Sequence, residues 1–235
     1  MHDVERNTLD TLYDLLQDLD PDKAGWCIDG GAGIQDFFGL YFTEWGWQSV
    51  IVEPLPSDAL LNSLHNGVML EPSALCANDG QVTLYTGHDG NTHSLDANWE
   101  NVTGHPHSKE PISVQGVRYL SLLEKYDIEH VACLKLDIEG SEWSVIRQLI
   151  EDDISLPQIV SIEYGGGYAK SSGMGGWAED RFTNILKCLD VLRACGYTHG
   201  AHCEEAIHEF TFAQHPRGIW RENAGYGNLV VWGIR

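Results

Sequence analysis

The sequence concentrates charged side chains where a short apolar strand ends. Residues 134–142 read LKLDIEGSE, and the segment that follows has the apolar spacing of a helix. Because alternate side chains of a strand share a face, Lys135, Asp137 and Glu139 are expected to point the same way. Charged groups are costly inside a sheet unless they reach its carboxyl edge, where α/β folds bind ligands. Asp137 and Glu139 are therefore candidate site residues, although helix capping or neutralisation by Lys135 would also explain them.

Residues 26–29 form another apolar strand, which leads into the turn Gly30-Gly31-Ala32-Gly33 and then into an apolar segment of helical character. Glycines at such a turn let the backbone approach a ligand and leave amide groups free to donate hydrogen bonds. The next apolar strand ends in Glu53, where nucleoside-binding α/β folds hold ribose hydroxyls. A tight connection and a solvated strand end would also explain these features, but together they indicate a nucleoside site. Its candidate residues are Asp29, Gly30, Gly31, Gly33, Glu53 and Pro54.

Two polar regions supply further candidates. Residues 86–110 form a long polar segment with little periodicity, and loops of this length in compact domains are often functional. Its four histidines could supply a base or a metal ligand, although His105 and His107 are expected to be solvated loop residues. His93 is the candidate base, because an unperturbed imidazole titrates near neutral pH. Glu163 ends the apolar strand at residues 157–164. The glycine- and serine-rich residues 165–178 that follow could serve as a substrate lid.

The bulk composition limits the possible partners. The chain has 235 residues, of which 43% are hydrophobic, so one domain over residues 1–235 is the simplest organisation. A net charge of −21 opposes binding to nucleic acid or membranes and suits a neutral or cationic small ligand, although solubility in a saline setting also explains it. The six cysteines show no CxxC pair and no regular spacing, so we expect no zinc site. Cys27 and Cys133 lie in predicted core strands, which indicates buried thiols in a reducing compartment. Without a hydrophobic signal core or a membrane-spanning run, we expect a cytoplasmic protein.

Alternating helical and apolar strand patterns along the chain predict an α/β fold. Residues 1–24 contain an amino-terminal helix whose leucines form one stripe, at Leu9, Leu12, Leu15, Leu16 and Leu19. That stripe predicts a lid or docking helix, which could pack on its own sheet or on a second subunit of a homo-oligomer. Residues 210–212 and 229–232 are the last two strands, and we expect them to form an antiparallel hairpin at the sheet edge.

This order of elements resembles the class I S-adenosylmethionine-dependent methyltransferase fold. The local motifs Val52-Glu53-Pro54, LKLDIEGSE and residues 157–163 resemble the FkbM family within it, and the resemblance covers about residues 25–164. It implies a Rossmann-like, mostly parallel seven-stranded sheet with an antiparallel edge hairpin and with helices on both faces. It also implies S-adenosylmethionine as cofactor and methyl transfer to a hydroxyl group of a small molecule, such as a sugar or a natural product.

The resemblance also implies roles for individual residues. Asp29, Gly31 and Gly33 would line the methionine end of the cofactor, and Glu53 would bind its ribose. Three consecutive residues would line the adenine: Ser73, Ala74 and Leu75. The turn departs from the family pattern in two places, because Gly33 stands where the family has Asn and Gln35 where it has a second Gly. Gly33 keeps backbone freedom but lacks a side-chain hydrogen bond, and Gln35 adds bulk near the cofactor's carboxylate.

The chemistry of methyl transfer assigns roles to the charged residues. The acceptor oxygen must lie in line with the methyl group and must lose its proton. We place Asp137 at the reaction centre, either holding the methionine amine or acting as the base. Glu139 and Glu163 are expected nearby, and His93 is a second candidate base. A divalent metal held by Asp137 and Glu163 would also acidify an acceptor hydroxyl, but two carboxylates are too few to assign metal ligands.

Two other functions are compatible with the same residues. A nicotinamide-dependent oxidoreductase would use the same turn and Glu53, but it predicts a clearer GxGxxG motif than residues 30–35 supply. A non-catalytic protein that binds a carbohydrate or a protein partner would suit the altered turn. The retention of several acidic candidates speaks against it, namely Glu53, Asp137, Glu139 and Glu163. Binding of S-adenosylmethionine separates these hypotheses.

Overall fold

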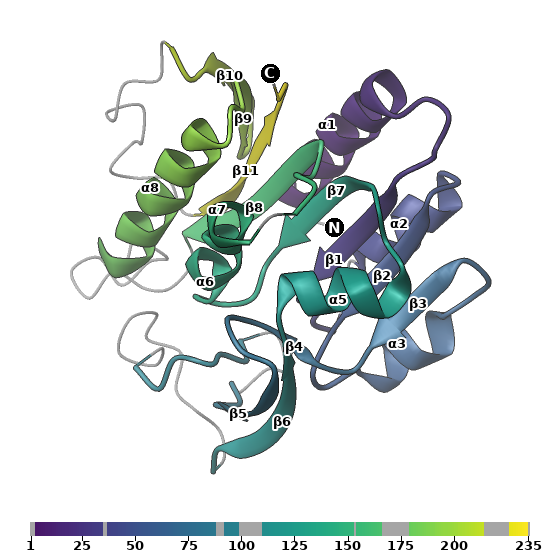
Figure 1. The fold of residues 1–235 in the computed structure, drawn as a ribbon, viewed down its shortest axis with the longest axis vertical. Coiled ribbons are helices and arrows are strands. Elements are labelled where there is room, and N and C mark those ends of the chain that lie inside the picture. Colours follow the sequence, from purple (N-terminus) through teal and green to yellow (C-terminus); the bar gives the residue numbers. More distant parts are fainter. Residues whose placement is uncertain are drawn as a thin grey trace.

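The computed structural model describes residues 3–34, 37–87, 92–98, 110–152, 154–165, 179–213 and 226–234. In this part of the chain, eight strands form one large sheet in the order β10-β9-β11-β8-β7-β1-β2-β3 (Figure 1). The strands are β1 (Trp26–Gly30), β2 (Gln48–Val52), β3 (Val68–Glu71), β7 (Val131–Leu136), β8 (Ile159–Gly165), β9 (His199–Cys203), β10 (Ile207–Thr211) and β11 (Tyr226–Trp232). Neighbouring strands are parallel from β3 to β8, and the remaining pairs are antiparallel.

The α/β class predicted from the sequence is confirmed, but the predicted seven-stranded sheet with its last two strands at the edge is wrong. The described sheet has eight strands, and β11 lies between β8 and β9 rather than at the edge. Leu229, Val230 and Val231 of β11 are fully buried, so this strand is covered on both faces of the sheet and lies in its interior. The edge is instead the hairpin of β9 and β10, and β10 exposes most of its side chains.

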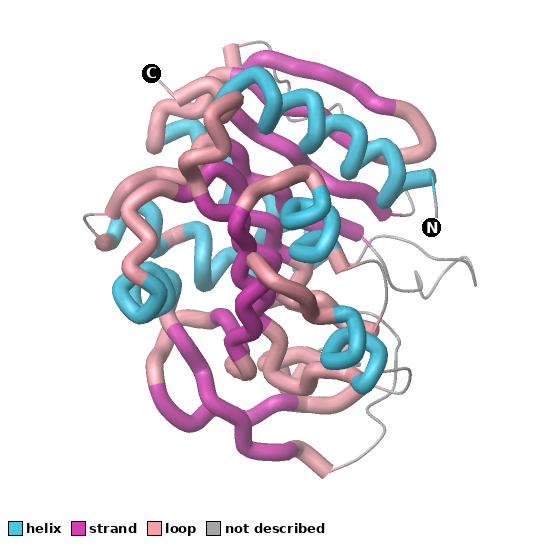
Figure 2. Tube along the Cα trace, turned by 90° about the vertical axis from the view of Figure 1, so that its right-hand side faces the viewer, coloured by secondary structure: helices cyan, strands magenta, loops and turns pink. Residues whose placement is uncertain are grey.

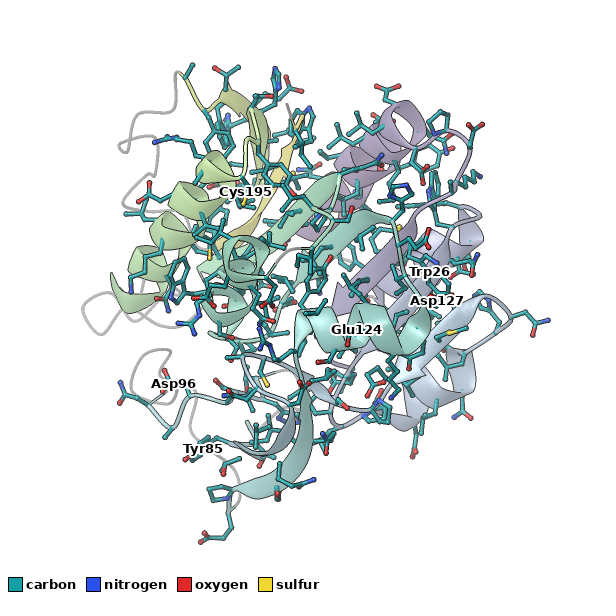
Figure 3. All side chains as sticks on the ribbon, viewed as in Figure 1. Trp26, Tyr85, Asp96, Glu124, Asp127 and Cys195 are labelled. Atoms are coloured by element: carbon teal, nitrogen blue, oxygen red, sulfur yellow. The ribbon has the colours of Figure 1, made fainter. Side chains whose placement is uncertain are left out.

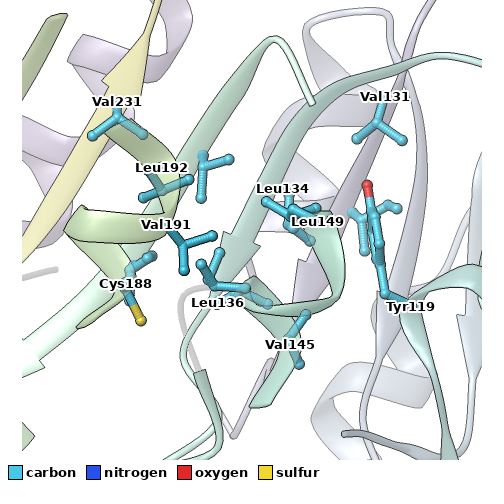
Figure 4. Packing of buried hydrophobic residues seen from close by; sticks show 14 of the residues in the cluster. Tyr119, Val131, Leu134, Leu136, Val145, Leu149, Cys188, Val191, Leu192 and Val231 are labelled. Atoms are coloured by element: carbon cyan, nitrogen blue, oxygen red, sulfur yellow. The ribbon is translucent and has the colours of Figure 1, made fainter. Parts of the chain in front are cut away.

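Helices cover both faces of the large sheet, as the side view in Figure 2 shows. One face carries α1 (Asp3–Leu19) and α2 (Phe38–Glu44), whose apolar side chains pack with those of β1, β7 and β11. The other face carries the largest apolar cluster, formed with α5 (Tyr119–Tyr126), α6 (Glu142–Ile146), α7 (Gln148–Glu151) and α8 (Glu179–Ala194) (Figure 4). The remaining described helix, α3 (Asp58–Ser63), packs beside β2 and β3.

The predicted leucine stripe of α1 packs on the chain's own sheet. Leu9, Leu12 and Leu16 are buried in the cluster with β7, β8 and β11, whereas Leu19 at the helix end is 37% exposed. Asp20 follows the last residue of the helix, and its carboxylate accepts hydrogen bonds from the backbone of Gly25 at 2.9 Å and from the indole of Trp47 at 2.8 Å. The buried leucines of the stripe therefore pack within one subunit, and α1 is fixed against the sheet.

A second, three-stranded sheet has the order β4-β6-β5 and lies below the large sheet in Figure 1. Its strands are β4 (Ala74–Leu75), β5 (Gly80–Leu84) and β6 (Ile112–Val117). Residues 92–98 run beside this sheet through the bridge of Tyr85 with Ser94, and Figure 3 labels Tyr85 there. The other residues between 88 and 109, and the predicted lid beyond Gly165, lie outside the described residues. Gln35 of the glycine turn lies outside them as well.

The helices of the described residues are too short or too polar to span a membrane. None of them combines the length and the apolar character needed to cross a bilayer.

Candidate functional site

Three parallel strands end side by side at one edge of the large sheet. Gly30 of β1 is in register with Val52 of β2 and with Leu136 of β7. The turn after β1 joins the neighbouring strand ends, because the N–H of Gly31 donates to the carbonyl of Val52 at 3.0 Å and the N–H of Asp137 to that of Gly30 at 2.9 Å. The three motifs singled out in the sequence therefore meet at the carboxyl edge, where ligands bind in such folds.

Gly31 allows the closest approach in this turn. It has a φ of +83°, and a Cβ atom there would lie 1.8 Å from the carbonyl oxygen of Asp137. Only glycine fits both the backbone conformation and the space. Gly33 has a φ of +59° and continues the turn in the same left-handed region. The glycines thus shape the backbone of the site.

A cavity of about 260 Å³ lies at this edge and is lined by both sheets. Seven of the predicted cofactor-binding residues line it: Gly31, Gly33, Glu53, Pro54, Ala74, Leu75 and Asp137. The predicted catalytic residues also line it: His93, Asp137, Glu139 and Glu163. Asp29, Gly30 and Ser73 are buried behind the lining, and the hydroxyl of Ser73 donates to Glu71. The structure brings the candidates together, and their individual roles stay predictions.

Lys135 and two aspartates form the electrostatic centre of the site. The Nζ atom of Lys135 lies 3.4 Å from Oδ1 of Asp29 and 3.3 Å from Oδ2 of Asp137, and it donates to the carbonyl of Gly31 at 3.0 Å. Burial alone would lower the pKa of Lys135, but the charges of Asp137, Asp29 and Glu163 outweigh burial and raise that pKa. Lys135 is therefore a permanent cation that holds Asp137 at the cavity wall.

Asp29 supports this centre from inside the protein. Its side chain is 0% exposed, compared with 28% for Asp137, and its Oδ2 atom accepts the N–H of Gly39 in α2 at 2.8 Å. Burial raises the pKa of Asp29, and the charge of Lys135 with the Gly39 hydrogen bond opposes that rise. Asp29 thus contacts Lys135 and α2 and supports the cavity wall from behind.

Glu53 is held by the backbone of two turns. Its Oε2 atom accepts the N–H of Gly33 at 3.2 Å, and its Oε1 atom accepts the N–H of Leu55 at 2.9 Å. Burial raises the pKa of Glu53, and the hydrogen bonds from the backbone of Leu55 and Gly33 oppose that rise. A carboxylate can accept about four hydrogen bonds, so Glu53 keeps capacity for a ligand hydroxyl after fixing the turn.

The turn after β7 is capped by a residue that the sequence analysis did not select. Glu142 accepts the N–H of Ile138 and that of Gly140, both at 3.1 Å. Glu139 has a φ of +52°, and its carbonyl accepts the hydroxyl of Ser94 at 2.6 Å, which ties the turn to residues 92–98. Glu142 thus fixes the turn before α6, and the N-cap position of that helix is Ser141, so neither Asp137 nor Glu139 stands at the capping position.

The ring of His93 has a defined hydrogen-bond role. Its Nδ1 atom accepts the backbone N–H of Gly87 at 3.1 Å. A neutral imidazole that accepts at Nδ1 carries its proton on Nε2, so the ring presents a donor at that atom. In this geometry His93 suits hydrogen-bond donation better than it suits the role of base. The carboxylates of the cavity are therefore the better candidate bases.

Two polar lining residues lie outside every motif that the sequence analysis singled out. Glu5 comes from α1 and Asn228 from β11, and both line the cavity. Asn228 is only 4% exposed, and its Oδ1 atom has no hydrogen-bond partner among the described residues. A polar residue beside the apolar run of residues 229–232 was the available signal for Asn228. Nothing in the sequence pointed to Glu5, because its position depends on how α1 packs on the sheet.

Potential metal ligands do not cluster in the part of the chain that the structure describes. It contains no group of three or more His, Cys, Asp or Glu side chains placed to hold a metal ion. We therefore assign no metal ion to the carboxylates of Asp137 and Glu163.

A glycine turn, acidic strand ends and a cavity at the carboxyl edge of parallel strands form the arrangement in which α/β folds commonly bind small ligands. The model of the methyltransferase FkbM domain matches residues 29–198, which is more than half of the chain. The chain therefore belongs to the FkbM methyltransferase family, as its motifs indicated, and this membership identifies it as a methyltransferase. No curated protein and no solved structure matches the chain.

Proposed function

We propose that this methyltransferase uses S-adenosylmethionine and transfers the methyl group to a hydroxyl oxygen of a small molecule, with sugars and natural products as the substrate class. The observation that carries the proposal is the gathering of the glycine turn, Glu53 and Asp137 around one cavity at the strand ends. The family match covers the same segments.

The cavity residues fit this cofactor. Gly31 and Gly33 let the main chain approach the methionine part, and Glu53 has capacity for the ribose hydroxyls. Ala74 and Leu75 of β4 provide an apolar wall for the adenine, extended by Leu84 of β5 in the same small sheet. When bound, the cofactor supplies an electrophilic methyl group on a positively charged sulfur. The acidic lining suits a ligand that carries positive charge.

The acidic residues divide the remaining tasks. Asp137 is held beside the glycine turn by Lys135, so it is suited to bind the ammonium group of the cofactor. Glu163 lines the cavity from the next strand, β8. We propose that its carboxylate is the base that accepts the proton of the acceptor hydroxyl. His93 donates a hydrogen bond and orients the acceptor. Methyl transfer then needs the acceptor oxygen in line with the methyl group.

Calorimetric titration with S-adenosylmethionine and S-adenosylhomocysteine tests the cofactor assignment. We expect micromolar binding by the wild type and at least about a tenfold loss in Glu53→Gln, since a charged hydrogen bond to ribose contributes about 1.5–3 kcal/mol. Glu124→Gln is the matched control, because Glu124 is exposed on α5 and lies outside the cavity lining (Figure 3). Absence of binding by the folded wild type would refute the proposal. Binding without turnover on any hydroxyl acceptor would favour the non-catalytic alternative, and binding of a nicotinamide nucleotide instead would favour the oxidoreductase.

A further inference from the structure

One part of the cavity wall is built by segments that the family model does not match. The model matches residues 29–198, whereas Glu5 lies on α1 and Asn228 lies on β11. Both residues line the same cavity as the glycine turn. Glu163 of β8, which is matched, stands directly opposite Asn228 in the antiparallel pair of β8 and β11. These three residues are termed the acceptor end of the cavity.

Asn228 is the residue that points to a ligand at the acceptor end. It lies in the interior of the large sheet, is 4% exposed, and lines the cavity. Its Oδ1 atom finds no hydrogen-bond partner among the described residues. A buried amide oxygen without a donor is unfavourable, so a ligand that donates a hydrogen bond here would satisfy it.

Glu5 is held in place by the packing of α1. Leu9 and Leu12 bury the following turns against the sheet, and the Nδ2 atom of Asn7 donates to the carbonyl of Glu204 at 2.8 Å. The first turns of α1 are thereby fastened to the segment after β9. A carboxylate fixed in this way can contribute to recognition at a small entropic cost.

The charge of the cavity wall selects the kind of donor. Five carboxylates line the cavity, at Glu5, Glu53, Asp137, Glu139 and Glu163. Among the described lining residues Lys135 is the one lysine or arginine. It lies against Asp29 and Asp137, and it also interacts electrostatically with Glu163. Two carboxylates and an amide oxygen offer three acceptors, which matches the three donors of a primary ammonium group. A neutral hydroxyl would gain much less from the carboxylates.

We propose that Glu5, Glu163 and Asn228 bind a protonated primary amine of the acceptor molecule, so that the substrate is an amino alcohol such as an amino sugar. This inference rests on the proposed function for the fate of the hydroxyl group, while amine binding itself does not depend on it. One carboxylate oxygen of Glu163 would bind the ammonium group and the other would face the hydroxyl to be methylated, which would then lie between this anchor and the cofactor.

Ligand-observed NMR with paired probes tests the proposal. Each pair differs only by an ammonium group in place of a hydroxyl: glucosamine with glucose, and ethanolamine with ethane-1,2-diol. We expect the amine of at least one pair to bind about tenfold more tightly than its hydroxyl counterpart, as a charge-assisted hydrogen bond would provide. Glu5→Gln and Asn228→Leu should remove this preference. Asp14→Asn on α1 makes the same charge change as Glu5→Gln at an exposed position outside the cavity lining, and it should keep the preference.

The titrations are repeated with saturating S-adenosylhomocysteine, so that the amine of the cofactor product occupies its own place. If the preference for the amine probe persists, the acceptor end is a separate amine site. If it disappears, the site holds the amine of the cofactor and the proposal is overturned. Equal behaviour of the two members of every pair also overturns it, including absence of binding by both. Folding of each variant is checked by thermal unfolding, and Glu5→Gln decides the matter if Asn228→Leu does not fold. Failure of the proposed function is recognised separately, because the wild type would then bind no S-adenosylmethionine in the calorimeter.

Discussion

The two ends of the cavity are built in different ways. At the cofactor end, parallel strands finish in register and the backbone makes the site, with Gly31 against Asp137 and Glu53 held by the N–H groups of two turns. At the acceptor end, side chains from α1 and the antiparallel part of the sheet meet, through Glu5 and Asn228. The family model covers the residues of the cofactor end. It does not cover α1 and β11, which contribute to the acceptor end. A backbone site requires particular residues at short spacing, whereas a side-chain site can change its specificity with few substitutions.

The largest expected effect concerns the buried lysine of the cofactor end. In Lys135→Met, Asp29 would stay completely buried without its cation, and removing one partner of a buried ion pair costs about 3–5 kcal/mol. Urea unfolding followed by circular dichroism measures this loss in the free energy of unfolding. The double variant Asp29→Asn/Lys135→Met should recover part of it, because the uncompensated charge is gone. A single variant within about 1 kcal/mol of the wild type would show that the ion pair does not organise this end.

A smaller loss of stability is expected from the glycine turn. In Gly31→Ala the new Cβ atom would overlap the carbonyl of Asp137, and the residue would have to keep a φ of +83°, at a cost of about 3 kcal/mol. Gly80→Ala is the matched control, since Gly80 has a φ of +101° but nothing within 4 Å of an added Cβ, so backbone strain of about 1–2 kcal/mol remains. Thermal and urea unfolding of both variants give the difference. Equal losses would show that the close approach at Asp137 is unimportant.

The smallest expected effect is a pH dependence from Glu53. Burial raises the pKa of Glu53 above the ordinary value of 4.5, so the folded protein binds this proton more readily than the unfolded chain does. Its contribution to stability is thus fully present below the unfolded pKa and is lost as the pH rises through the folded pKa. Relative to Glu53→Gln, the wild type should therefore become more stable as the pH falls from about 7 to about 5. Urea titrations across that range measure the difference in unfolding free energy. If the wild type instead became less stable relative to the variant as the pH falls, burial would not raise the pKa of Glu53.

The sequence was informative where local pattern controls structure. The turn after residue 29, the end of β2 and the segment after β7 could each be predicted as part of one site, because a parallel sheet brings successive strand ends to the same edge. The roles within the site were harder to predict. Asp29 looked like a ligand-facing residue, but its spacing could not reveal that Lys135 and Gly39 would surround it.

Long-range packing explains what the sequence did not reveal. The apolar residues of β11 gave no indication of whether the strand lies at an edge or between β8 and β9, since both positions accept an apolar strand. The leucine stripe of α1 predicted burial but gave no direction, so the arrival of Glu5 at the cavity could not be foreseen. The acceptor end therefore became visible only in three dimensions.

Hydrogen exchange of the whole chain with and without S-adenosylhomocysteine tests most directly whether the two ends have separate tasks. We predict slower exchange in residues 30–34, 53–55 and 137–140, whose backbone forms the cofactor end, with little change in the first turns of α1 and around Asn228 in β11. Protection centred on α1 and β11, with the glycine turn unaffected, would place the nucleoside at the acceptor end and contradict this division of the cavity.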